Sequence, residues 1–188
     1  MRSLYLRWQL TGGIGSGKSE VRRLLEQHGI RTVDADSVGH SILEREAFEA
    51  VSNIWPDVVV DGVIDRSSLA RVVFGEPEQL RALEAITHPL IFDRIETELA
   101  GFDSVAVVEM PLIDSDLRWP RMVVDSLEEV RIRRAVERGM QPDDVQRRLA
   151  AQPSRAMWLG SADLVVPNHG SLRDLEQTTA MLATYLTG

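Results

Sequence analysis

The sequence predicts an α/β fold in which helices flank a five-stranded parallel sheet. Short apolar stretches alternate with longer stretches whose apolar residues recur at helical spacing. The connections between them are short, which requires right-handed parallel crossovers. A glycine-rich loop, residues 12–19, also lies between the first apolar stretch and the first helical pattern. This order places a candidate ligand site at one edge of the sheet.

Composition limits the class of protein. A chain of 188 residues suits one globular domain with small insertions, and its 44% hydrophobic and 27% charged residues exclude disordered and fibrous classes. No apolar run approaches a membrane span, residues 1–7 lack a signal-peptide core, and there is no cysteine. We therefore expect a cytoplasmic protein without membrane contact. A net charge of −8 argues against general nucleic-acid binding.

The first third of the chain begins with a strand, a helix and a second strand. Residues 4–10 form the first apolar stretch, and Val21, Leu24 and Leu25 supply the buried stripe of the following helix. Gly29 is the expected C-terminal cap of this helix. Residues 30–33 then read as a strand. Asp34 therefore falls at the C-terminal end of a strand, where open parallel sheets bind ligands.

The pattern from residue 37 to about residue 101 is mostly helical. Gly62, Gly75 and Pro77 interrupt it, and Pro89 is expected in the first turn of a further helix, where a missing N–H does no harm. This segment predicts a helical insertion. Further strands are expected at 105–108, 121–124 and 164–166, amphipathic helices at 130–138 and 145–158, and a helix at the C-terminus.

Residues 12–19 read GGIGSGKS and match the GxxxxGKS pattern of a phosphate-binding loop. Glycines let the main chain approach an anion and adopt unusual dihedral angles. Lys18 is expected to reach the outer phosphates, and Ser19 to bind the magnesium that accompanies ATP or GTP. A simple glycine turn is the alternative, but the position between strand and helix favours phosphate binding. The expected nucleotide contacts are Gly13, Ile14, Gly15, Ser16, Gly17, Lys18 and Ser19.

Three carboxylates lie at predicted strand ends. Asp34 can orient an attacking hydroxyl and accept its proton, the role that phosphoryl transfer leaves to a base, rather than only cap a helix. Asp36 is expected to be a helix N-cap. Glu109 closes the apolar strand 105–108 and resembles the acidic group that holds magnesium in phosphate-loop proteins, although a solvated strand end is an open alternative.

Seven arginines between residues 131 and 155 are expected mostly to form a solvated helix face. A lid over transferring phosphate needs guanidinium groups, and Arg138 and Arg155 are best placed for this by their loop context. His88, before Pro89, is more typical of a cap or packing residue, and we retain it as a candidate substrate-binding residue. The four histidines show no metal-ligand spacing.

Several short motifs follow one another in a specific order. They are TGGIGSGKS at 11–19, Asp34-Ala35-Asp36, His88-Pro89-Leu90-Ile91, Pro111-Leu112, Val123-Val124-Asp125, Arg134 with Arg138, Ala150-Ala151-Gln152 with Arg155, Ala162-Asp163, and Asn168-His169-Gly170. Very many proteins share the loop alone, whereas the combination is specific. In this arrangement the chain resembles the bacterial dephospho-coenzyme A kinase family almost from end to end.

The resemblance implies a P-loop kinase fold in three parts. These are a nucleotide-binding core of residues 1–36 and 102–188, a coenzyme-binding insertion of residues 37–101, and a small lid within about 138–158. It also implies ATP-dependent phosphorylation of the ribose 3′-hydroxyl of dephospho-coenzyme A, with Mg²⁺, as the last step of coenzyme A synthesis. We expect the protein to be a monomer.

Residue by residue, the resemblance places Lys18 and the loop amides on the ATP phosphates and Ser19 on magnesium. Asp34 becomes the base toward the ribose hydroxyl, Arg138 the lid arginine, and Asn168 a neighbour of adenine. Three departures stand out. Glu20 replaces the usual small residue, and Val166-Pro167-Asn168 replaces the usual acidic approach to the final loop. Asp114 and Ser115 stand where members commonly have Phe and Glu, which leaves any substrate contact there open.

Other functions of a phosphate loop fit less well. A GTP-dependent switch would need an NKxD motif, which is absent, and the DxxG match at residues 36–39 comes too soon after Lys18. Lys18, Ser19 and Asp34 argue against a nucleotide-binding interaction protein without catalysis. Another small-molecule or nucleoside monophosphate kinase is the main alternative.

Overall fold

The computed structural model describes residues 6–111 and 118–188. The chain divides into two compact units: one comprises the residues up to Asp34 and from Phe102 onward, and the other comprises Ala35–Gly101. No helix in the described ranges is long and apolar enough to cross a membrane.

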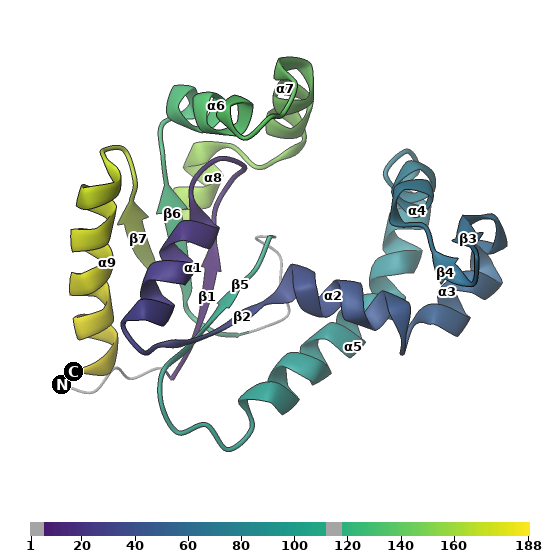
Figure 1. The fold of residues 1–188 in the computed structure, drawn as a ribbon, viewed down its shortest axis with the longest axis horizontal. Coiled ribbons are helices and arrows are strands. Elements are labelled where there is room, and N and C mark those ends of the chain that lie inside the picture. Colours follow the sequence, from purple (N-terminus) through teal and green to yellow (C-terminus); the bar gives the residue numbers. More distant parts are fainter. Residues whose placement is uncertain (1–5, 112–117) are drawn as a thin grey trace. The chain divides into compact units, whose positions relative to one another are not determined.

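The first unit is built on a five-stranded sheet with the order β2-β5-β1-β6-β7 (Figure 1). Every neighbouring pair in it is parallel, which confirms the predicted α/β class. Because β1 is the central strand, the loop that follows it lies in the middle of the C-terminal edge. The strands are β1 Arg7–Thr11, β2 Arg31–Asp34, β5 Ala106–Glu109, β6 Arg121–Asp125 and β7 Leu164–Pro167.

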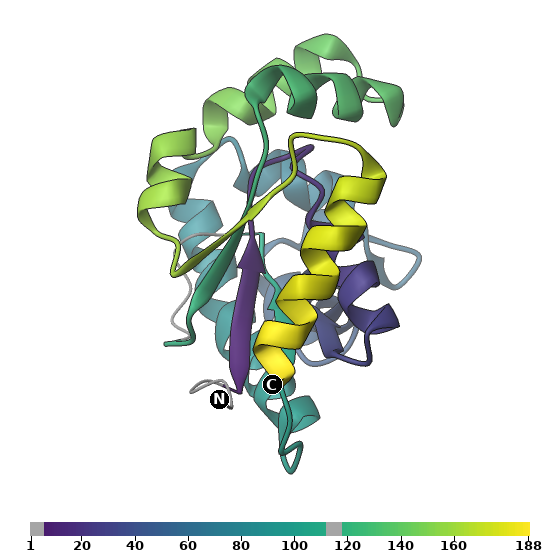
Figure 2. The ribbon, with the colours of Figure 1, turned by 90° about the vertical axis from the view of Figure 1, so that its left-hand side faces the viewer.

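Two helices, α1 (Lys18–Gln27) and α9 (Leu172–Thr187), pack against each other and against the sheet (Figures 1 and 2). Their apolar stripes and the side chains of four strands form the main core of this unit. In α1 the predicted residues Val21, Leu24 and Leu25 are buried there. The core is closed at the α9 end by Leu175, Leu182, Ala183 and Leu186.

Helix α1 ends as the sequence predicts, at a glycine. Gly29 has φ +78°, its N–H donates to Glu26 O at 2.9 Å, and the N–H of Ile30 donates to Leu25 O at 3.1 Å. These two bonds form a Schellman motif, in which a left-handed residue satisfies the last helix carbonyls. Leu25 and Ile30 are both buried in the core, so the motif turns the chain directly into β2.

Three short helices join β6 to β7: α6 (Glu128–Glu137), α7 (Pro142–Ala151) and α8 (Arg155–Gly160). The prediction of one helix over 145–158 is wrong. Pro153 disfavours a helical conformation for the residue before it, and Gln152 is extended, with φ −93° and ψ 156°. Ser154 then begins a new helix as its N-cap and accepts a hydrogen bond from the Met157 N–H.

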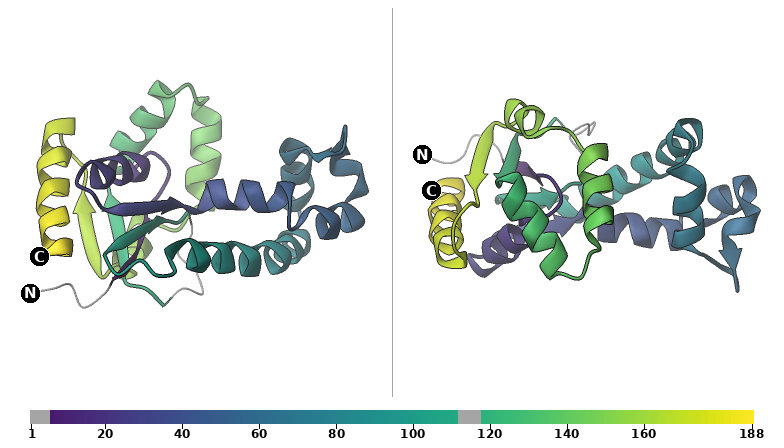
Figure 3. Two further views of the ribbon diagram at one scale, coloured as in Figure 1. Left: turned by 60° about the horizontal axis from the view of Figure 1, so that its bottom comes forward. Right: turned by 90° about the horizontal axis from the view of Figure 1, so that it is seen from above.

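The second unit is mainly helical. Its long helix α5 and the helix α2 lie side by side (Figure 3). The elements are α2 Ala35–Glu44, α3 Phe48–Ile54, a 3₁₀ turn Pro56–Val58, β3 Val59–Val60, β4 Val63–Ile64, α4 Arg66–Val73 and α5 Pro77–Leu99.

The small antiparallel hairpin β3-β4 in this unit was not predicted. Asp61 and Gly62 connect its strands, with φ values of +50° and +79°. Asp-Gly between β-branched residues is a strong signal for a two-residue hairpin turn, because both turn positions need positive φ. The sequence therefore contains a signal for this turn, although Gly62 also fits an interruption between helices.

Two further expectations about the second unit are wrong. Pro89 lies inside α5, and Pro77 occupies the start of that helix. Pro89 cannot donate to the carbonyl of Ala85, but both residues are exposed, so water can satisfy that carbonyl. Asp36 is not an N-cap, because β2 ends at Asp34 and α2 begins at Ala35. Asp36 instead lies in the first turn, where its charge favours the helix dipole.

We expect Gly29→Ala to lower the free energy of unfolding by about 1–2 kcal/mol, because no side chain crowds the position but φ is left-handed. Gly29→Asn should lose less, since asparagine tolerates this conformation. Urea unfolding of the three proteins measures both differences. Wild-type stability of Gly29→Ala would contradict the role of the Schellman motif.

Candidate active site

The phosphate loop connects β1 to α1 at the centre of the sheet. Gly15 and Gly17 have left-handed φ values of +72° and +98°, and Gly17 is the N-cap residue of α1. The N–H of Ser16 donates to Gly13 O at 3.1 Å, which closes a turn within the loop. The first N–H groups of α1 thus follow directly on this loop, and a glycine-rich loop that leads into a helix N-terminus is the arrangement that binds anions.

Glycine is also required because the loop touches the protein behind it. A Cβ on Gly12 would lie 2.7 Å from Val124 O, and one on Gly15 would overlap the carbonyl of Arg131. A Cβ on Gly17 would overlap the side-chain amide of Asn168. The glycines therefore serve packing within the protein as well as the approach of a ligand.

Lys18 and Ser19, the first residues of α1, lie where the sequence predicts a phosphate and a metal ligand. Lys18 Nζ donates to Gly12 O at 2.7 Å, so its charge is held beside the loop. Ser19 Oγ donates to Glu109 Oε1 at 3.0 Å. Glu109 is the buried last residue of β5, so the structure brings the two predicted metal ligands together.

Asp34 and Glu109 are neighbours, because β2 and β5 are parallel and these two residues are Cα partners in the ladder. Arg22, one turn after Lys18 on α1, lies between their carboxylates. Its Nε donates to Glu109 Oε2 at 2.9 Å, and its Nη2 lies 3.6 Å from Asp34 Oδ2. The candidate base and the candidate metal ligand thus share one arginine.

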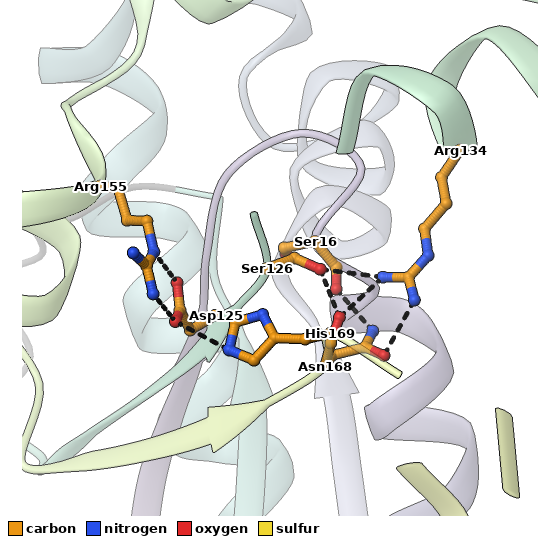
Figure 4. Close-up of polar contacts among 7 residues, drawn as sticks. All are labelled: Ser16, Asp125, Ser126, Arg134, Arg155, Asn168 and His169. Atoms are coloured by element: carbon orange, nitrogen blue, oxygen red, sulfur yellow. Dashed lines mark hydrogen bonds and ion pairs between the residues drawn. The ribbon is translucent and has the colours of Figure 1, made fainter. Parts of the chain in front are cut away.

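Asn168, which follows β7, is buried against the phosphate loop (Figure 4). Its Nδ2 donates to Ser16 O at 2.7 Å. Arg134 of α6 donates to Asn168 Oδ1 at 3.1 Å and to Ser126 Oγ at 3.0 Å. The amide nitrogen of Asn168 therefore holds the loop, while its amide oxygen is held by Arg134.

Arg131 of α6 also contacts the loop. It is 5% exposed, and its Nε donates to Ile14 O at 2.8 Å. Gln152, in the break between α7 and α8, accepts from the Ile14 N–H at 2.8 Å and from Arg131 Nη2 at 3.2 Å. Burial lowers the pKa of Arg131 from its usual value, although an arginine remains charged.

Similarity to known proteins agrees with this geometry. The dephospho-CoA kinase family model matches residues 8–174. A dephospho-CoA kinase of Corynebacterium glutamicum is 41% identical, with 94% of this chain and 95% of the relative covered. The chain belongs to the dephospho-CoA kinase family.

Solved structures agree with the family assignment. A crystal structure of a Thermus thermophilus protein superposes with a TM-score of 0.87 at 33% identity and covers 99% of this chain and 100% of its own. A dephospho-CoA kinase from Campylobacter jejuni has a TM-score of 0.73 at 24% identity, with 96% of each chain covered, and therefore shares the fold. The P-loop kinase fold and the dephospho-CoA kinase family predicted from the sequence are thus both confirmed.

Arg138 and His88 are two further candidate residues of this dephospho-CoA kinase family member. Arg138 is the exposed C-cap residue of α6, and its charge contributes to lowering the pKa of Glu20, after the larger effect of a hydrogen bond from Arg23. His88 belongs to the second unit, where its ring lies 5.7 Å from that of Phe92 on α5. The departures at Asp114 and Ser115 lie outside the described residues.

Sequence reasoning assigned no role to Arg22, Arg131, Arg134 or Gln152, which all contact the site. Arg22 had a usable signal: it is four residues after Lys18 and must therefore lie on the same face of α1. Gln152 belongs to the motif Ala150-Ala151-Gln152 that supports the family resemblance. Neither it nor Arg131 had a signal for its contact with Ile14, because that contact depends on how α6 and α7 fold back over the loop.

Asp125, the last residue of β6, forms a second ionic group at the sheet edge (Figure 4). Arg155 donates to its two carboxylate oxygens at 2.8 and 2.6 Å, and His169 Nε2 lies 3.3 Å away. The hydrogen bond from Arg155 lowers the pKa of Asp125, and this effect outweighs the opposing effect of burial. The predicted phosphate-lid arginine Arg155 is thus bound to a carboxylate in this structure.

We expect Asp125→Asn to lower the free energy of unfolding by about 1–3 kcal/mol at pH 7, because a charged hydrogen-bond pair is lost. The folded pKa of Asp125 is depressed, so its contribution is complete above the unfolded value, about 3.9. The difference from wild type should therefore be present at pH 5 and shrink below about pH 4. Denaturant unfolding at several pH values tests this, with Asp103→Asn, at an exposed loop position of the same unit, as control. A pH-independent difference would contradict it.

Proposed function

We propose that this chain transfers the γ-phosphoryl group of ATP to the ribose 3′-hydroxyl of dephospho-coenzyme A and thereby completes coenzyme A. One observation carries the proposal within this family: Asp34 and Glu109 are paired on adjacent strand ends beside the phosphate loop. A base and a metal ligand are the two acidic groups that phosphoryl transfer requires.

The phosphate loop and Lys18 would bind the phosphates of ATP. The backbone N–H groups at the start of α1 supply fixed donors, and the Lys18 ammonium offsets negative charge on the transferring group. Lys18 is already held at the loop by Gly12 O, so little reorganisation precedes binding.

The residues present fit a magnesium ion. Mg²⁺ prefers oxygen ligands. Ser19 Oγ and Glu109 Oε1 are two such oxygens, and they lie 3.0 Å apart. No group of three or more acidic or histidine side chains among the described residues could hold a metal. The remaining ligands would therefore come from phosphate oxygens and water, and the bound ion would offset charge on the β- and γ-phosphates.

Asp34 is the proposed base. It ends β2, and its carboxylate lies at the same sheet edge as the phosphate loop. There it would accept the proton of the attacking hydroxyl and orient its oxygen toward the γ-phosphorus. Positioning of this kind contributes most of the catalysis in phosphoryl transfer.

The helical second unit would bind the acceptor substrate. Residues 35–101, a unit far longer than a loop connection requires, would bind the coenzyme, with His88 as a contact. Arg138 would act as the lid arginine over the phosphates, and Asn168 would border adenine. We propose a cytoplasmic monomer that binds neither nucleic acid nor membrane, which accords with the net charge of −8.

A panel of acceptors tests the activity. With Mg²⁺ and ATP, we expect phosphate transfer to dephospho-coenzyme A and little transfer to AMP, shikimate or gluconate. The product should carry its new phosphate at the ribose 3′ position, as shown by mass spectrometry and phosphorus NMR. Lys18→Ala serves as the inactive control. Efficient transfer to AMP or shikimate alone would reject the proposed substrate and retain a P-loop kinase.

A single substitution separates binding from chemistry at the proposed base. Asp34→Asn retains shape but removes the proton acceptor, so kcat should fall by about a hundredfold or more while ATP affinity changes little. Steady-state kinetics and calorimetric ATP binding measure the two quantities. Asp36→Asn, two residues along the chain, is the matched control. Wild-type turnover by Asp34→Asn would place the base elsewhere.

A further inference from the structure

Arg22 contacts three carboxylates at the proposed site. Its Nε donates to Glu109 Oε2 at 2.9 Å, its Nη1 to Glu26 Oε1 at 2.8 Å, and its Nη2 lies 3.6 Å from Asp34 Oδ2. Neither a sequence motif nor the family resemblance gives this arginine a role. Its guanidinium is nevertheless the group that joins the proposed base to the proposed metal ligand.

The sheet creates the need for such a group. Asp34 and Glu109 are Cα partners on adjacent parallel strands, and strands in a sheet lie about 4.8 Å apart. Two like charges this close repel each other, and Glu109 is also buried, which strengthens the repulsion. A cation between the two carboxylates offsets this repulsion.

The two oxygens of Glu109 have different partners. Oε2 accepts from Arg22, whereas Oε1 accepts from Ser19 Oγ. Arg22 thus fixes the rotation of the carboxylate and leaves Oε1 beside the serine hydroxyl. This is the orientation in which Ser19 and Glu109 present adjacent oxygens to one ion.

We propose that Arg22 is a positioning residue for phosphoryl transfer: it keeps Asp34 and Glu109 together at the site and directs Glu109 Oε1, with Ser19, toward magnesium. This inference rests on the proposed function.

An arginine suits this task better than a lysine. Its planar fork can reach two carboxylates at once, whereas an ammonium is a point charge on a flexible stem. Glu26, one turn further along α1, holds the third nitrogen and steadies the side chain. Burial lowers the pKa of Arg22, but the hydrogen bond and charges of its carboxylate partners outweigh burial and raise it, so the cation persists.

The test compares Arg22→Met with Arg22→Lys. Calorimetry gives the affinity for ADP in the presence of Mg²⁺ and in the presence of EDTA. The ratio of these two affinities measures how strongly Mg²⁺ favours nucleotide binding. In Arg22→Met this ratio and kcat should each fall by about tenfold or more, the usual effect of losing a partner of a metal ligand. Affinity in EDTA should stay within about twofold. Arg22→Lys should recover part of both losses.

Two further variants serve as controls for charge loss elsewhere and for misfolding. Arg173→Met removes an exposed cation of α9 in the same unit and should leave both readouts unchanged. If Arg22→Met does not give a cooperative melt, Arg22→Gln repeats the test with a donor nitrogen but no charge, and the same losses are expected.

The outcomes separate this inference from the proposed function. If folded Arg22→Met keeps the wild-type kcat and the wild-type ratio of ADP affinities with Mg²⁺ and with EDTA, the role of Arg22 is overturned, even if dephospho-coenzyme A is the acceptor. Equal losses in Arg22→Met and Arg22→Lys would also overturn it, because the role requires charge. A fall in the metal ratio in Arg22→Met, together with inactivity of the wild type toward dephospho-coenzyme A, would support Arg22 and reject the substrate.

Discussion

The close approach of the phosphate-loop backbone to its neighbours is the constraint on which the site depends. The loop must offer its N–H groups to an anion in front while it packs against Val124 O, the Arg131 carbonyl and the Asn168 amide behind. Side chains at Gly12, Gly15 or Gly17 would fill that contact. Because the loop has no side chains at these points, its backbone can pack this closely against its neighbours.

The site also requires that groups distant in sequence lie close together. The parallel sheet provides this, because β2, β5 and β6 end in Asp34, Glu109 and Asp125 at the same edge. Each of these carboxylates has a cationic partner: Arg22 for the first two and Arg155 for the third. Each carboxylate at this sheet edge is therefore paired with an arginine, which offsets its negative charge and fixes its position.

Local features of the sequence predicted much of the fold and part of the site. Gly29, with its positive φ, and the strand-end carboxylates Asp34 and Glu109 follow from rules that need only a few neighbouring residues. The same rules failed where chain context decided the outcome. Pro89 fits an N-terminal turn as well as an exposed helix interior, and only the length of α5 distinguishes them. The Asp61-Gly62 hairpin turn is also a local signal, but helical periodicity alone does not detect it.

The contacts that sequence could not supply are those between the loop and the helices α6 and α7. Arg131 accounts for the Ile14 carbonyl and Gln152 for the Ile14 N–H, so both polar groups of one loop residue are bound by this helical segment. The break at Pro153 is what frees Gln152 from a helical conformation. Any movement of α6 and α7 relative to the sheet must therefore either break these bonds or carry Ile14 with it. The segment predicted as a lid is thus bonded directly to the loop that it would cover.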